Sequence, residues 1–132
     1  MEIESEYQFD YVVQSKDLAK ELSIDANDDF PEVFATSRMV ALMELAAARL
    51  MKPLLQDGEL SVGVNVNINH IAATPNNEVV NTVATFKGME GKLFSFEVEL
   101  FDNGGKAGFG THTRAIVKTE RLLQGAQGRV KG

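Results

Sequence analysis

An apolar stripe between Phe34 and Lys52 constrains the fold of this chain more than any other feature of the sequence. Intervals of three and four residues separate its members, as on the buried face of an α-helix. The stripe consists of Met39, Val40, Met43, Ala46, Ala47 and Leu50. Pro53 ends the run because proline cannot continue the helical hydrogen-bond ladder, and Thr36 or Ser37 can cap its start. We therefore predict one long core helix over residues 34–52.

The rest of the chain has mostly the pattern of strands. Apolar and polar residues alternate in five segments, 7–13, 62–68, 78–87, 94–100 and 106–118. Short turns join most of the later segments, so we expect these strands to be antiparallel. The cleanest alternation places Val62, Val64, Val66 and Ile68 on one parity, and His70 continues that parity.

A sheet with one apolar face and a single apolar helix has one obvious way to bury both, which is to wrap the sheet around the helix. The sequence therefore predicts an α+β fold, an antiparallel sheet of about five strands around one long central helix. One helix covers only part of such a sheet, so we expect edge-to-edge pairing in a homodimer. We assign a single domain to residues 1–120. Residues 121–132 are polar and rich in glycine, which predicts a flexible C-terminal tail.

Composition narrows the classes of function. The chain has no cysteine, which excludes disulfides and cysteine nucleophiles, and its two histidines are too few for a histidine-rich metal centre. A net charge of −6 disfavours nonspecific binding to nucleic acid or anionic membranes. No apolar run approaches the roughly 20 residues that span a bilayer, and the acidic N-terminus lacks the core of a signal peptide. We therefore expect a cytoplasmic protein without nucleic-acid or membrane partners.

Three polar residues stand out near the predicted core: Thr36, Glu44 and His70. Each has an ordinary explanation. A threonine at a helix start is usually a cap, a glutamate within a helix usually faces solvent, and a histidine at a strand end is usually structural. Taken alone, these residues indicate only a soluble α+β domain.

Their spacing adds a resemblance to a known family. Thr36 and Glu44 lie in the run Ala-Thr-Ser-Arg-Met-Val-Ala-Leu-Met-Glu, residues 35–44, and His70 lies in Asn-His-Ile-Ala-Ala-Thr-Pro, residues 69–75. With Gly63 between them and Thr-His-Thr-Arg at 111–114, this pattern resembles the fluoroacetyl-CoA thioesterase group of hot-dog-fold proteins. The similarity runs from residue 34 to residue 117 and includes the gaps between the motifs.

The resemblance implies a hot-dog fold, a dimer and hydrolysis of an acyl-CoA thioester to a carboxylic acid and free CoA. It also implies a catalytic triad of Thr36, Glu44 and His70, with Gly63 and Arg114 in contact with the substrate. No cofactor is implied, because CoA is part of the substrate. His112 shares the strand parity of Arg114. These two residues are either a solvated pair on an exposed face or, through Arg114, an anion site for CoA.

The residue types suit thioester hydrolysis, which needs a nucleophile, a base and a donor for the developing oxyanion. Thr36 supplies a hydroxyl at a helix N-terminus, and a histidine can exchange a proton near neutral pH. Glu44 could orient the histidine, activate water or attack the carbonyl itself. Eight helical positions separate Thr36 from Glu44 by about 12 Å, so we expect the site to combine residues of two subunits unless Thr36 precedes the helix.

The loop before the helix bears on substrate choice. It is acidic, and its two aromatic residues are Phe30 and Phe34. They could be staples packed under the loop or part of a flap over a pocket. In the family the corresponding loop forms an aromatic gate, to which Phe30 would correspond. The sequence leaves open fluoroacetyl-CoA, a broader short- or medium-chain acyl-CoA and an aryl-CoA. It also leaves open a hot-dog protein that binds acyl-CoA or a small ligand without turnover, and a dehydratase of the same fold.

Overall fold

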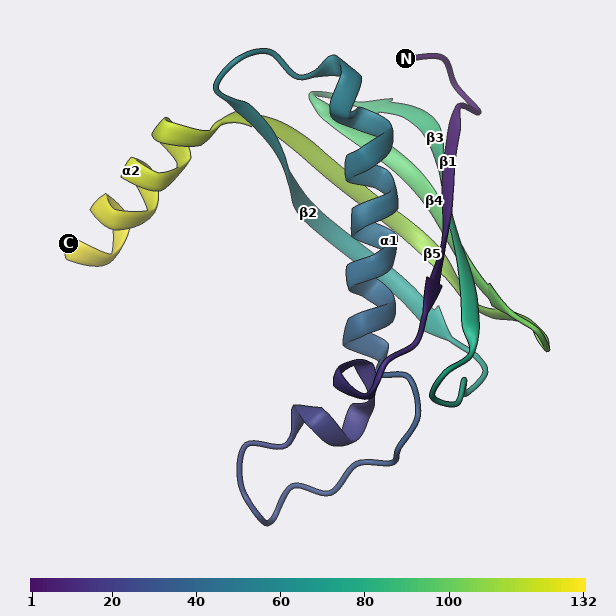
Figure 1. The fold of residues 1–132 in the computed structure, drawn as a ribbon. Helices are drawn as coiled ribbons and strands as arrows, with labels where there is room; N and C mark the ends of the chain where they lie inside the picture. Colours follow the sequence, from purple (N-terminus) through teal and green to yellow (C-terminus); the bar gives the residue numbers. More distant parts are fainter.

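The computed structural model describes all 132 residues. One five-stranded sheet has the strand order β1-β3-β4-β5-β2, with every neighbouring pair antiparallel. Its strands are β1 (Glu6–Val12), β2 (Glu59–His70), β3 (Val79–Glu90), β4 (Leu93–Asp102) and β5 (Gly105–Lys118), and the helices are α1 (Thr36–Met51) and α2 (Thr119–Lys131). Figure 1 shows the sheet curving behind α1, so the predicted α+β architecture is confirmed.

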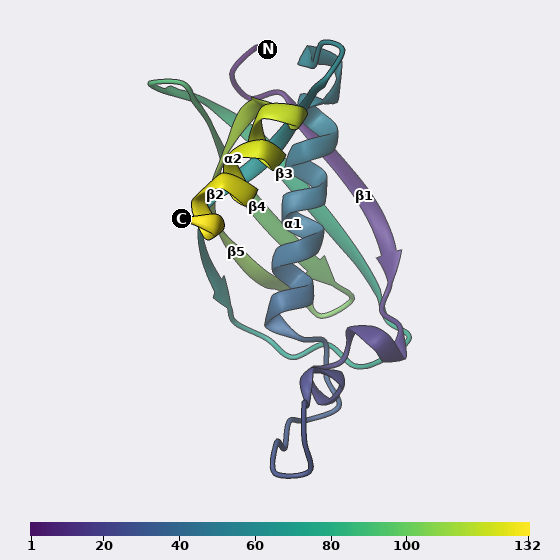
Figure 2. The same ribbon diagram turned by 90° about the vertical axis from the view of Figure 1, so that its left-hand side faces the viewer.

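The core lies between α1 and the concave face of the sheet. Figure 2 shows α1 lying lengthwise against the strands, between the edge strands β1 and β2. The buried helical side chains are Met39, Leu42, Met43, Ala46, Ala47 and Met51. The predicted helix is confirmed, but its buried face includes Leu42 and Met51, whereas Val40 and Leu50 of the predicted stripe are only half-buried. Because the sheet curls around the helix, it covers a wider arc than a flat sheet would.

A β-bulge at Val64 changes the face on which the residues of β2 lie. Gly63 pairs with Arg114 and Asn65 pairs with Thr113, so Val64 is the extra residue. The prediction that Val62, Val64, Val66 and Ile68 share one face is therefore wrong. Directly paired residues share a face of the sheet. Gly63 and the later residues Val66, Ile68 and His70 thus face α1, whereas Val62 points to the opposite side.

A buried carboxylate anchors the segment that leads into α1. Asp17 accepts hydrogen bonds from Tyr11 Oη (2.6 Å), the Gln14 backbone N–H (2.8 Å) and Arg38 Nε (2.9 Å). Burial alone would raise the pKa of Asp17, but these hydrogen bonds outweigh it and hold the pKa below 3.8. The Asp17 carbonyl also accepts the N–H of Ala35. Asp17 therefore fixes both the residue before α1 and the first turn of the helix.

The C-terminal segment, which the sequence predicts as a flexible tail, forms the helix α2. Leu122, Ala126 and Arg129 follow the helical spacing, and basic residues in the last turn suit the helix dipole. Glycines 125 and 128, which weaken helices and contributed to the prediction, do not interrupt α2. α2 has no buried residue and extends away from the sheet on the β2 side (Figure 1).

None of the helices combines the length and apolar character needed to cross a bilayer.

Candidate functional site

Thr36 and His70 form a hydrogen-bonded pair where the start of α1 meets the end of β2. Thr36 Oγ1 lies 2.7 Å from His70 Nδ1. Ala35 is the N-cap residue and no side chain caps the helix, so the capping role considered for Thr36 is not observed. Its hydroxyl is committed to the histidine instead. The other ring nitrogen, His70 Nε2, is buried without a hydrogen-bond partner. A hydroxyl with a base in hydrogen-bonding reach is the arrangement required for nucleophilic catalysis.

A mostly apolar pocket of about 330 Å³ opens beside this pair. Its walls come from the loop before α1, the start of α1 and the segment after β2, and are lined by Ala19, Pro31, Val33, Phe34, Ala35, Thr36, His70, Ile71, Ala72 and Ala73. Phe34 is buried, which confirms it as a staple under the loop. Phe30 is 43% exposed and does not line this pocket.

Glu44 belongs to a second polar group, one that contains Arg114 and Gly63. Arg114 Nη1 lies 3.3 Å from Glu44 Oε1, and the two side chains are 8% and 41% exposed. A Cβ atom on Gly63 would lie only 2.4 Å from Glu44 Oε1. The absence of a side chain at position 63 is therefore what lets the carboxylate lie against the backbone of β2. The substrate contact that the resemblance implies for Gly63 stays a prediction; in the structure this glycine makes room for Glu44.

Arg114 and His112 are buried on the inner face of β5, with exposed fractions of 6% and 1%. Of the two alternatives left open by the sequence, a solvated pair on an exposed face is therefore excluded. Arg114 Nε donates to Ser61 Oγ and Nη2 donates to the Ser61 carbonyl, each across 3.0 Å. Nη1 also lies 3.2 Å from His112 Nε2. We call Glu44, Ser61, Gly63, His112 and Arg114 the Glu44 cluster. His112 was not selected as a site residue from the sequence. The only sequence signal for it is that it shares the strand parity of Arg114.

The Thr36–His70 pair and the Glu44 cluster do not meet within one chain. Neither Thr36 nor His70 hydrogen-bonds to Glu44, whose polar partner is Arg114. Both Thr36 and Glu44 belong to the regular helix α1, and eight residues of α-helix rise about 12 Å. The structure thus brings together two of the three residues of the predicted triad and leaves the third at a distance along the helix.

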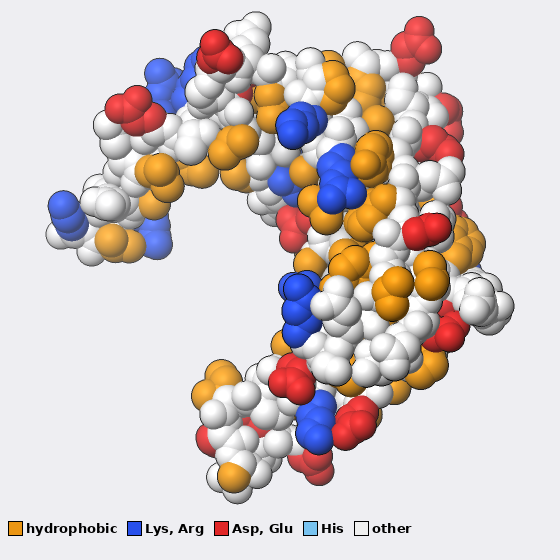
Figure 3. Space-filling view, viewed as in Figure 1, with side chains coloured by type: hydrophobic (Ala, Val, Ile, Leu, Met, Phe, Trp, Pro, Cys, Tyr) orange, Lys and Arg blue, Asp and Glu red, His pale blue; other side chains and the backbone are white.

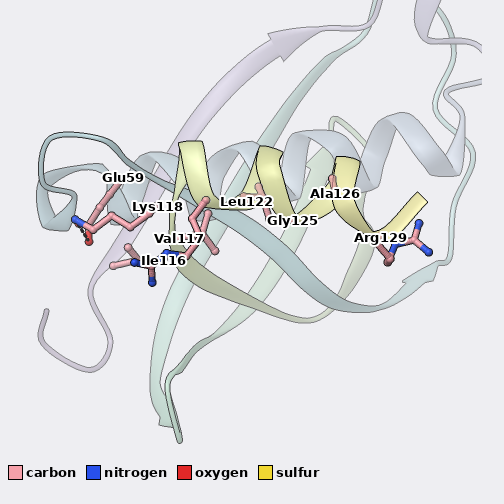
Figure 4. A pocket seen from close by; sticks show the side chains of 9 residues that line it. Glu59, Ile116, Val117, Lys118, Leu122, Gly125, Ala126 and Arg129 are labelled. Atoms are coloured by element: carbon pink, nitrogen blue, oxygen red, sulfur yellow. Dashed lines mark ion pairs between the residues drawn. The ribbon is translucent and has the colours of Figure 1, made fainter. Parts of the chain in front are cut away.

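A larger pocket of about 600 Å³ lies elsewhere, between α2 and the ends of β2 and β5. Figure 4 shows its lining side chains, among them the ion pair of Glu59 with Lys118, whose charged atoms are 3.6 Å apart. None of the predicted site residues lines it. No group of three or more acidic, histidine or cysteine side chains is placed to hold a metal ion.

Comparison with known proteins identifies the family. The model of the family described as fluoroacetyl-CoA-specific thioesterase matches residues 13–120. The fluoroacetyl-CoA thioesterase of Streptantibioticus cattleyicolor is 37% identical over 124 residues, which cover 92% of this chain and 89% of that protein.

Solved structures agree with this assignment. A threonine-to-serine mutant of the fluoroacetyl-CoA thioesterase, in complex with acetyl-CoA, is 34% identical, with a TM-score of 0.92 and 98% coverage of both chains. A hot-dog-like protein from Thermanaerovibrio acidaminovorans has a TM-score of 0.85 at 21% identity, covering 98% of this chain and 93% of its own, and confirms the hot-dog fold. The chain therefore belongs to the family of fluoroacetyl-CoA-specific thioesterases and is an acyl-CoA thioester hydrolase.

Proposed function

We propose that Thr36, His70 and Glu44 carry out the hydrolysis, with Thr36 as the nucleophile. The observation that carries this proposal is the 2.7 Å contact between Thr36 Oγ1 and His70 Nδ1. His70 can accept the hydroxyl proton as Thr36 Oγ1 attacks the thioester carbonyl carbon. The C–S bond then breaks, and the CoA thiolate leaves with the proton from His70. The product of this half-reaction is an acyl ester on Thr36.

The second half-reaction needs a water molecule, and Glu44 is the residue that we assign to it. Its carboxylate lies beside the Arg114 guanidinium and remains 41% exposed, so it can accept a proton from water. The water oxygen attacks the acyl ester, the ester bond to Thr36 breaks, the proton held by Glu44 passes to the Thr36 oxygen, and the carboxylic acid is released. Gly63 supports this role because it leaves room for the Glu44 carboxylate beside β2.

We further propose that the complete site spans two protomers of a homodimer. The separation of Glu44 from Thr36 and His70 along α1 supports this arrangement, because a second copy can bring its own Glu44 to the pair. β2 is an edge strand whose Val64 and Val66 are exposed. Figure 3 shows hydrophobic side chains on the face over α1 and on the inner side of α2, with a hollow between α2 and the loop that precedes α1. A second copy paired along β2 would cover part of this surface.

A short acyl-CoA is the substrate class that the pocket favours. The pocket beside Thr36 measures about 330 Å³, near the lower end of the range for ligand sites. Alanines 35, 72 and 73 contribute to its apolar lining. One solved relative holds acetyl-CoA, and another, a phenylalanine-to-alanine mutant, holds fluoroacetate and CoA. We propose that Phe30 in the loop before α1 contacts the acyl-CoA substrate. The proposed effect of Arg114 on the substrate is indirect, through its contact with Glu44.

Release of free thiol from a series of acyl-CoA thioesters tests this assignment. Because the chain has no cysteine, a colorimetric thiol reagent reports only the CoA released. We expect fast release from two- to four-carbon acyl groups, and a loss of about 100-fold or more in Glu44→Ala and in His70→Ala. Circular dichroism and the melting temperature check that these variants fold. Unchanged turnover in both folded variants would overturn the site assignment.

A further inference from the structure

His112 is a buried histidine that the proposed reaction does not use. We propose that His112 is a positioning residue, which holds Arg114 through its Nε2 acceptor so that the guanidinium contacts only one oxygen of Glu44. This inference rests on the proposed role of Glu44 in activating water. It assigns His112 no contact with substrate.

The hydrogen bonds of His112 define its tautomer. Its Nδ1 lies 2.7 Å from the backbone carbonyl oxygen of Asn65. A carbonyl oxygen can only accept, so Nδ1 carries the ring proton, and in the neutral ring Nε2 is then an acceptor. Burial, aided by the nearby Arg114 charge, lowers the pKa of His112 below 6.5, although the Asn65 and Glu44 interactions oppose the shift. The ring is therefore neutral at pH 7.

Arg114 is held at three of its nitrogens. Ser61 accepts from Nε and Nη2, and the Nη1 atom lies 3.2 Å from His112 Nε2. Nη1 carries two hydrogens, so the second can be directed at Glu44 Oε1, 3.3 Å away. The guanidinium plane is thus set by Ser61 and His112, and Glu44 receives a single hydrogen bond.

That single contact has a chemical consequence. An arginine that is free to rotate favours a two-point contact with a carboxylate, which is stronger and occupies both oxygens. In the structure only Oε1 contacts Arg114, so Oε2 remains available to accept a proton from water. Removing the Nε2 acceptor would free one edge of the guanidinium to turn toward Oε2. His112 thereby keeps Arg114 on Oε1 and leaves Oε2 of Glu44 open to water.

Amide substitutions separate this role from simple packing. In His112→Asn, the amide N–H₂ can keep the bond to the Asn65 carbonyl, but no acceptor remains at the Nε2 position. In His112→Gln, the longer side chain carries an amide oxygen to that position. We expect His112→Asn to lower kcat by about 10- to 100-fold with KM changed by less than about two-fold, and His112→Gln to recover most of the lost rate. Melting temperatures of the two variants should be similar.

A parallel assay of Glu44→Gln distinguishes failure of this inference from failure of the proposed function. Inactive Glu44→Gln, together with kcat higher in His112→Gln than in His112→Asn, supports the positioning role. Inactive Glu44→Gln with equal kcat in the two folded His112 variants would overturn the positioning role alone. Fully active Glu44→Gln would overturn the proposed role of Glu44 and, with it, this inference.

Discussion

Thr36 and His70 are 34 positions apart in the chain, and yet Thr36 Oγ1 lies 2.7 Å from His70 Nδ1. Two backbone hydrogen bonds keep the segment before α1 in place: the Phe34 N–H donates to the Thr74 carbonyl and the Ala35 N–H to the Asp17 carbonyl. The hydroxyl is therefore presented by an anchored helix start and the imidazole by the last residue of a strand. Rigid elements of this kind position reacting groups better than mobile loops do.

Substitution of Thr36 tests the role of its hydroxyl. Thr36→Ser keeps an oxygen that can bond to His70, so we expect it to retain at least about a tenth of the wild-type kcat. Thr36→Ala removes the nucleophile and should lower kcat by about 100-fold or more. Thiol release at saturating acetyl-CoA measures both. Equal rates in the serine and alanine variants would show that the hydroxyl takes no part in the reaction.

Glu44→Gln should trap the acyl ester. The amide cannot accept a proton from water, so Thr36 is acylated but deacylation is slow. After incubation with acetyl-CoA, intact-mass spectrometry should show one added acetyl group, and peptide mapping should place it on Thr36. The double variant with Thr36→Ala is the control and should show no adduct. An inactive Glu44→Gln without an adduct would contradict the covalent route and favour direct attack of water on the thioester.

Gly63→Ala should reduce activity by displacing Glu44. The new Cβ would lie 2.4 Å from Glu44 Oε1, closer than non-bonded atoms can approach. Because a displacement of about 1 Å can cost about 100-fold, we expect kcat to fall by at least about 10-fold. Gly125→Ala is the matched control: nothing lies within 4 Å of its Cβ. It should leave kcat unchanged and stabilise α2 by up to about 1 kcal/mol. Full activity in Gly63→Ala would show that Glu44 need not lie against β2.

His112 should make the free energy of unfolding depend on pH. Burial lowers its folded pKa below 6.5, whereas the unfolded chain binds a proton near that value. As pH falls below 6.5, the unfolded state gains more protons than the folded state, so stability decreases. Urea unfolding between pH 7 and pH 5 measures this effect, and His112→Gln should remove that part of the slope. Equal slopes in the wild type and in His112→Gln would show that His112 has the same pKa in the folded and the unfolded state. Asp17, with a folded pKa below 3.8, titrates under this range.

Local patterns were sufficient to predict most of the fold. The three- and four-residue spacing around Met39 and Met43 marked α1, and the alternation around Phe96 and Val98 marked β4. Both patterns report which side of an element is buried, which is the property that decides how a helix and a sheet pack. The bulge at Val64 escaped prediction because it depends on how β2 aligns with β5. The residues before the bulge alternate among themselves as expected. Relative to the residues after the bulge, however, each lies on the opposite face from the one that simple alternation predicts.

The candidate site was predictable only in part. Thr36, Glu44 and His70 could be selected because their spacing matches a family pattern. The burial of His112 and Arg114 could not, since strand parity alone does not say whether a polar face lies toward the helix or toward solvent. Their burial depends on the tertiary contacts of Arg114 with Ser61 and Glu44. The reason for Gly63 likewise emerged only once Glu44 was placed beside it.

In the proposed site, Thr36 and His70 of one protomer act with Glu44 of another, and this arrangement can be tested by mixing two inactive variants. Thr36→Ala and Glu44→Ala are unfolded together, refolded as a mixture and assayed for thiol release, with each variant refolded alone as the control. If the site is shared, every mixed dimer contains one intact site, and random pairing restores about a quarter of the wild-type activity. If each site lies within one protomer, every site carries a substitution. We expect recovery to about a quarter of the wild-type activity. A mixture no more active than its separate components, once mixed dimers are shown to form, would rule out a site shared between protomers.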